Sequence, residues 1–168
     1  MGMEEFYAIY QQGKKGEGGW DSYCYEWWWK RDYRLPGARF TKARGKLVLL
    51  GPHQQTRDIW KILPATASQA ARAAARRIFE RALVSKDEIA IAKRVLKHLV
   101  ALEYLPKRAT WKSPEVAAYL AWRREKIGEL RGGETQFKVE YLENDVDCFE
   151  NTGRPVISAK YLKSPCEM

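Results

Sequence analysis

The sequence is poor in the residues that form disulfides and bind structural metals, with 3 cysteines and 2 histidines among 168 residues. Cys24, Cys148 and Cys166 are odd in number and include no CxxC pair, so neither a disulfide framework nor a zinc site is indicated. This cysteine usage is typical of a reducing compartment. We therefore expect no metal and no cofactor.

Long hydrophobic runs are also missing. No stretch approaches the roughly 20 apolar residues that cross a membrane. The first residues lack the basic start and apolar segment of a secretory signal. The sequence therefore predicts a cytoplasmic protein without a membrane partner.

Catalytic and nucleotide-binding motifs are absent as well. The glycine-rich segment 11–19 contains no GxxxxGK[ST] pattern and no GxGxxG turn opening a helix, so it is interpreted as a mobile hairpin loop. His53 and His98 have no spaced partner that would complete a catalytic triad. The protein is not expected to be an enzyme.

One acidic segment leaves a catalytic alternative open. Asp145 and Asp147 alternate, and carboxylates that alternate along a strand share a face and suit Mg²⁺. The surrounding asparagines and Gly153 favour instead an acidic connection between two strands. A metal-dependent nuclease is therefore kept as a third hypothesis.

Positive charge is abundant and concentrated in the middle of the chain. The net charge is +9 and the pI is about 9.5. Residues 53–132 contain 17 basic and 8 acidic residues, whereas 1–52 contain 9 and 6, and 133–168 contain 4 and 7. Such a charge favours polyanionic partners such as DNA or RNA. With 45% hydrophobic residues, the length predicts one domain spanning 1–168.

Strands are expected near both ends of the chain. Aromatic and β-branched residues dominate 6–10 and 20–30, and the apolar run 46–50 reads as a central strand ended by Gly51-Pro52. Phe137, Val139 and Tyr141 alternate in period two, and a last strand is expected over 155–162. The prediction is an α+β domain whose antiparallel sheet is built from both chain ends, 1–52 and 133–168.

The section 53–132 is expected to supply three to four helices that pack on this sheet. A short helix over 55–63 precedes one that Thr66 or Ser68 caps and that runs to about Val84. Ser85 and Glu88 form a capping box that begins a helix ending near Glu103. Ser113-Pro114-Glu115 begins another, which Gly132-Gly133 closes.

The two central helices each carry basic residues opposite an apolar stripe. The expected stripes are Ala71, Ala74, Ala75, Ile78 and Ala82 in the first helix, and Ile91, Ala92, Val95, Leu96, Leu99 and Leu102 in the second. The basic residues, called the basic surface below, are Arg72, Arg76, Arg77, Arg81, Lys86, Lys93, Arg94 and Lys97. They are interpreted as a binding surface, with a simple solvated surface as the alternative.

Two residues of the helix at 114–132 add to this hypothesis. Trp122 projects about 120° from the buried side of that helix, so it is expected at the surface or at a rim, where it can stack on a base. Arg123 points into the apolar arc. It must extend its charge to solvent, pair with an acid or face a functional cavity.

The run Trp27-Trp28-Trp29 is the second unusual feature. On a strand, Trp27 and Trp29 share one face and Trp28 takes the other. Trp28 is therefore a candidate for a stacking platform, and Lys30, Arg31 and Arg34 are available to hold phosphates. The alternative is a sheet that is covered on both faces.

These patterns together predict a non-catalytic protein that binds nucleic acid or belongs to a nucleoprotein complex. The alternative is a phage- or mobile-element-type inhibitor, similar in kind to an anti-CRISPR protein, that docks on a host nucleoprotein or nuclease. The choice between DNA and RNA stays open.

Overall fold

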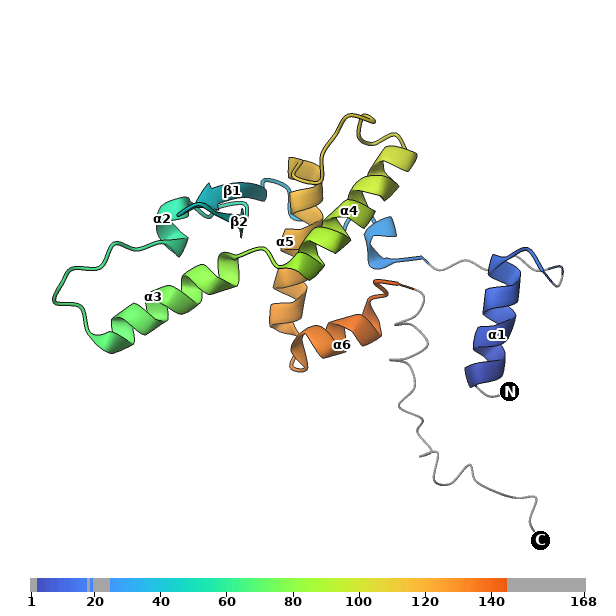
Figure 1. Cartoon of the computed structure of the whole chain (residues 1–168), viewed down its shortest axis with the longest axis horizontal. Coiled ribbons are helices and arrows are strands. Elements are labelled where there is room, and N and C mark those ends of the chain that lie inside the picture. The colour runs from blue at the N-terminus through green and yellow to red at the C-terminus, as the bar shows by residue number, and fades with distance from the viewer. Residues whose placement is uncertain (1–2, 18, 20–24, 145–168) are drawn as a thin grey trace, which may run out of the picture. The chain divides into compact units, whose positions relative to one another are not determined.

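The computed structural model of the chain describes residues 3–17, 19 and 25–144. Within these ranges it contains six α-helices, one 3₁₀ helix and a two-stranded antiparallel sheet (Figure 1), which confirms the predicted α+β class. By their contacts, the residues divide into two compact units, Lys30–Gly128 and the segments on either side of it. That the whole chain is a single domain stays a prediction.

The sheet is a hairpin of β1 (Arg39–Ala43) and β2 (Lys46–Leu50), in which Ala43 lies opposite Lys46. Arg44 and Gly45 form the two-residue turn with φ of 51° and 74°. Two left-handed residues are what a type I′ turn requires, because its twist matches that of the flanking strands. The strand at 46–50 is confirmed, whereas β1 was not predicted.

The section 1–52 contributes to the sheet as predicted, since it contains both strands, but the described part of 133–168 contributes no strand. The predicted strand 6–10 lies within the helix α1 (Met3–Lys14), which also includes the start of the predicted glycine-rich loop. Phe6, Ile9 and Tyr10 have the i, i+3, i+4 spacing of a helix, although Phe6 and Tyr10 alone also fit the period of a strand, and Lys14 in the last turn complements the helix dipole. The predicted strand 155–162 lies outside the described residues.

The three tryptophans form a 3₁₀ helix, η1 (Trp27–Trp29), and not a strand. The backbone N–H of Trp29 donates to the carbonyl of Glu26 at 3.0 Å. A strand would place Trp27 and Trp28 on opposite faces, whereas this tight turn lets both be buried, with exposed fractions of 4% and 2%. Of the rest of the predicted strand 20–30, residues 25, 26 and 30 are not in a strand, and 20–24 lie outside the described residues.

The strand predicted around Phe137 is also wrong, because these residues form α6 (Gly133–Glu140). Two polar pairs with helical spacing support it: Glu134 with Lys138 at 3.8 Å, and Gln136 with Glu140 at 2.6 Å. Gly132 is the N-cap of α6. The Gly132-Gly133 pair therefore begins this helix, and the preceding helix ends earlier, at Glu129.

The predicted helices between 53 and 132 are confirmed, except that the first is shorter than the predicted 55–63 and covers only 56–59. Two of the predicted caps are confirmed: Ser68 accepts from the Ala71 N–H at 3.1 Å, and Ser85 and Glu88 exchange both bonds of a capping box. Ser113, predicted as the N-cap of the helix that begins at Pro114, has a buried hydroxyl without a hydrogen-bond partner among the described residues. The helices are α2 (Thr56–Ile59), α3 (Gln69–Ala82), α4 (Lys86–Ala101) and α5 (Pro114–Glu129).

The core of the unit Lys30–Gly128 includes a cluster between the hairpin, α2 and α3. Its buried members are Ala43, Val48, Leu50, Ile59, Phe79 and Ala82. The apolar stripe predicted for α3 is partly wrong: Ala82 is buried as expected, but Ala74 is exposed, Ile78 is 40% exposed, and Phe79 is buried in place of Ile78. Phe79 was missed since the alanines around it suggested a neighbouring arc.

A second group of buried side chains lies on α4 and α5. Most of the stripe predicted for α4 is buried, including Ile91 and Val95, but Leu102 is 41% exposed because it follows the end of the helix. On α5 the six consecutive residues from Val116 to Ala121 are all buried. Because consecutive residues point in all directions around a helix, α5 is covered on every side over this stretch.

Candidate nucleic-acid interface

The basic surface is exposed as predicted. All eight of its residues, four on α3 and four on α4, are exposed. The two helices follow each other directly, joined by the short connection Leu83–Ser85 (Figure 1). The basic surface therefore runs over two successive helices of one unit.

The members of the basic surface differ in how far they are already engaged. Arg72 donates to the carbonyls of Ala65 and Ala67 at 2.7 and 3.2 Å, and Arg76 pairs with Glu80 at 2.8 Å. Other members make no side-chain hydrogen bond or ion pair with any residue that the structure describes, namely Arg77, Arg81, Lys86, Lys93 and Lys97. Among the described residues, no hydrogen bond or ion pair with the protein offsets these five positive charges.

A groove of about 840 Å³ lies between α3, the hairpin and the segment that follows α2. We call it the cationic groove, because five basic residues line it, and Glu80 is the acid among the lining residues. The basic residues are Arg44, Lys46, Lys61, Arg72 and Arg76. Two of them, Arg72 and Arg76, belong to the basic surface, so the groove extends that surface onto the hairpin.

An aromatic pair forms part of the wall of the cationic groove. The rings of Trp60 and Phe79 meet edge to face, with centroids 5.4 Å apart. The guanidinium of Arg44 lies over the Trp60 ring, 3.9 Å from its centroid. Arg44 is the first residue of the hairpin turn, so the type I′ geometry places this cation over the indole. Arg44 and Trp60 could not be singled out from the sequence, because they meet only in the folded chain.

Trp122 is half-buried and stacks on Tyr33, with ring centroids 4.1 Å apart and planes inclined by 7°. Two basic residues predicted to hold phosphates are also engaged with aromatic rings: Lys30 lies 4.7 Å from the Tyr33 centroid and Arg31 lies 3.9 Å from that of Tyr104. Trp122, Lys30 and Arg31 thus take part in intramolecular stacking away from the cationic groove.

The structure places two predicted binding residues in the interior. Trp28 is 2% exposed, so its ring has no surface on which a base could stack. The exposed indole of the run is that of Trp29, whose Nε1 donates to Glu26 at 2.9 Å. Arg123 is 4% exposed, in agreement with its predicted place in the apolar arc, and its charge contributes to lowering the pKa of Glu88.

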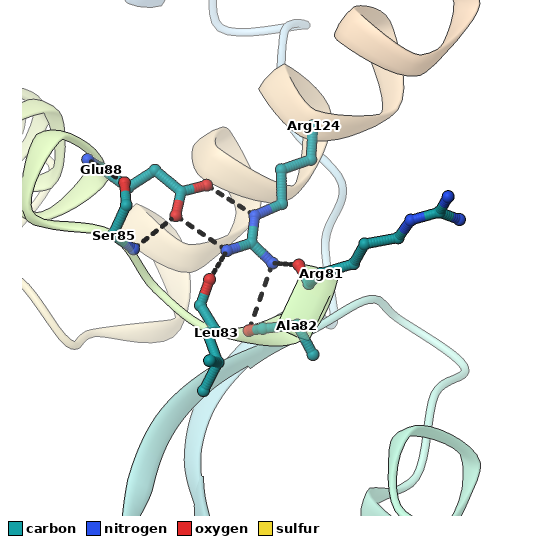
Figure 2. Close-up of polar contacts among 6 residues, drawn as sticks. All are labelled: Arg81, Ala82, Leu83, Ser85, Glu88 and Arg124. Carbon is teal, nitrogen blue, oxygen red and sulfur yellow. Dashed lines mark hydrogen bonds and ion pairs between the residues drawn. The ribbon is translucent and has the colours of Figure 1, made fainter. Parts of the chain in front are cut away.

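The neighbouring Arg124, which sequence analysis did not single out, organises the junction between α3 and α4 (Figure 2). Its guanidinium donates to the backbone carbonyls of Arg81, Ala82 and Leu83 at 3.1, 3.4 and 2.8 Å. These carbonyls lie at the end of α3, where backbone carbonyls have no acceptor role within the helix itself. The side chain of Arg81, a member of the basic surface, extends away from this cluster (Figure 2).

Arg124 also forms a two-pronged ion pair with Glu88, at 2.6 and 2.8 Å. Burial alone would raise the pKa of Glu88, but the hydrogen bond and charge of Arg124, the Ser85 N–H and the charge of Arg123 together lower this pKa below its ordinary value. Arg124 therefore fixes the direction in which the two basic helices leave their junction.

The metal-dependent nuclease hypothesis is not tested by the part of the chain that the structure describes. Within it, no three His, Cys, Asp or Glu side chains gather closely enough to hold a metal ion. Asp145 and Asp147, on which the nuclease hypothesis rests, lie outside the described residues. No helix in the described ranges has the length and apolar character of a membrane span.

Comparison with known proteins adds no functional assignment: no protein-family model, curated protein or solved structure matches the chain.

Proposed function

We propose that the protein binds nucleic acid in a non-catalytic role, with the phosphate backbone held by the basic surface of α3 and α4. The observation that carries this proposal is the set of five exposed cations without a protein partner among the described residues. Like charges on adjacent turns repel one another, and a polyanion removes that repulsion while releasing its own counterions. The cationic groove supplies further basic groups next to the same helix.

The proposal is tested with a variant in which Arg77, Arg81, Lys93 and Lys97 are replaced by alanine. Binding of fluorescein-labelled DNA and RNA is followed by anisotropy over a series of salt concentrations. We expect weaker binding and a smaller dependence of log affinity on log salt, reduced by about 0.7 to 0.9 for each phosphate that the variant no longer neutralises. The melting temperature should change little, because all four side chains are exposed.

The matched control replaces Lys15, Lys107, Arg108 and Arg131, which are also exposed but lie elsewhere in the chain. This control variant removes the same number of positive charges, but from positions outside the basic surface. An equal loss of affinity in the two variants would mean that net charge alone drives binding. Undiminished affinity in the first variant would exclude the basic surface.

A second candidate function is that of a phage- or mobile-element-type inhibitor, similar in kind to an anti-CRISPR protein, that docks on a host nucleoprotein or nuclease. The observation that favours it is Ile62, which lines the cationic groove and is 91% exposed. Ile62 shares the groove with Trp60 and Phe79, and contiguous apolar surface rimmed by charged groups is typical of protein contacts. Co-purification of a protein partner that survives nuclease treatment would favour this second function.

A further inference from the structure

The cationic groove combines positive charge with apolar surface. Among the lining residues, five are basic, and Glu80 is already paired with Arg76 at 2.8 Å. Trp60, Phe79 and Ile62 add aromatic and aliphatic surface to the same groove. The ligand that complements it must therefore carry several negative charges and also offer flat or apolar groups at close spacing.

We propose that the cationic groove binds single-stranded nucleic acid, with an unpaired base stacked on Arg44 and the backbone phosphates on the neighbouring basic groups. This inference rests on the proposed function and narrows it to a strand form and a site. The stacking element is the Arg44–Trp60 pair, 3.9 Å apart. A planar guanidinium that lies on an indole keeps its outer face for a base and its N–H edge for a phosphate.

The placement of this pair is well defined by the fold. Arg44 occupies a two-residue turn with fixed left-handed geometry, and Trp60 is held from the side by Phe79 of the buried cluster. A preorganised pair loses little conformational freedom when a ligand binds. Lys46 and Lys61 line the same groove, and both are exposed.

Single strands fit this groove better than a duplex does. In a duplex the flat faces of the bases are stacked on one another, so the protein can reach only base edges, sugars and phosphates, and no base could stack on the aromatic surface of the groove. An unpaired base can cover aromatic and aliphatic surface, and each stacked base is worth a substantial part of the affinity. The groove volume, about 840 Å³, lies within the range of roughly 300–1,000 Å³ typical of small-ligand pockets. This size suits a short stretch of single strand.

The test compares the intact protein with Arg44→Lys, which keeps the charge but loses the planar group. Anisotropy is measured with a labelled oligothymidylate, an oligouridylate and a DNA duplex. We expect affinity for the single strands to fall about 5- to 10-fold in Arg44→Lys, at the low end of what one stacked base contributes, while duplex affinity and the salt dependence stay unchanged. The control is Arg57→Lys, the same exchange at an exposed residue of α2 outside the groove, and it should leave all affinities unchanged.

The possible failures are distinguishable. If the protein binds none of the three nucleic acids, the proposed function and this inference both fall. If the four-residue alanine variant of the basic surface loses nucleic-acid binding but Arg44→Lys keeps it, the proposed function stands and the cationic groove is not the single-strand site. A poly-glutamate peptide that binds in place of the single strands, and is weakened by Arg44→Lys, would overturn the inference in favour of an acidic protein partner.

Discussion

Arg124 of α5 and Glu88 of α4 form an ion pair in which the Nε and Nη2 atoms donate to the two carboxylate oxygens, at 2.6 and 2.8 Å. The same guanidinium holds the last carbonyls of α3, and the same carboxylate accepts the Ser85 N–H that begins α4. One pair thus joins an end of α3, the start of α4 and the middle of α5 (Figure 2). Mutations here should act on stability before they act on binding.

Replacement of Arg124 by alanine is expected to lower the free energy of unfolding by about 3 kcal/mol. The change leaves the Glu88 carboxylate and the α3 carbonyls without their main donor, and such unpaired groups are costly when water has little access. Only 23% and 11% of the Arg124 and Glu88 side chains are exposed. Denaturation in urea measures the effect.

The matched control for Arg124 is Arg76→Ala. Arg76 also pairs with a glutamate, Glu80, at 2.8 Å, but the two side chains are 80% and 50% exposed. An exposed pair one helical turn apart contributes only about 0.3–0.5 kcal/mol. If the two substitutions lowered the free energy of unfolding equally, the burial of the Arg124–Glu88 pair would add nothing to stability.

Stability should depend on the protonation of Glu88 in acid. Because its pKa is lowered in the folded protein from an ordinary 4.5, the ionised form contributes stability above about pH 4.5. That contribution is lost as the pH falls through the lower, folded-state pKa. We expect the melting temperatures of the intact protein and Glu88→Gln to differ at neutral pH and to converge in acid. A constant difference across this range would contradict the coupling.

Replacement of Trp122 by alanine is expected to cost about 2 kcal/mol of stability, and Trp122→Phe less than about 1 kcal/mol. The indole is half-buried and stacked on Tyr33, so the alanine variant lacks the ring stacking that phenylalanine can retain. Affinity for nucleic acid should be unchanged in both. A loss of affinity at unchanged stability, measured by anisotropy and urea denaturation, would restore Trp122 as a binding residue.

Features with local causes could be predicted from the sequence. Ser85 and Glu88 lie three residues apart and satisfy each other's backbone groups, so the start of α4 is determined by four consecutive residues. The exposure of the basic surface follows similarly from helical periodicity. The secondary structure of two short aromatic segments could not be predicted in this way. The spacing of apolar residues in 6–10 and 137–141 fits a strand as well as a helix.

The residues missed in the candidate site depend on distant partners. Arg124 sits in the run Arg123-Arg124-Glu125, and nothing nearby distinguishes it, since its acceptors lie 36 to 43 residues away in the sequence. The contact of Arg44 with Trp60 likewise requires the hairpin turn and the end of α2 to be assembled first. Only the folded chain brings such pairs together.

At the turn position of Arg44, selection for stability and selection for binding favour different amino acids. Its φ of 51° lies in a region that asparagine and glycine adopt at lower cost than arginine does. Variants selected only for heat resistance should therefore gain by replacing Arg44, and in doing so would remove the cation that lies on Trp60. Retention of arginine at this position among natural variants of the chain would mean that the groove is under selection for something other than folding.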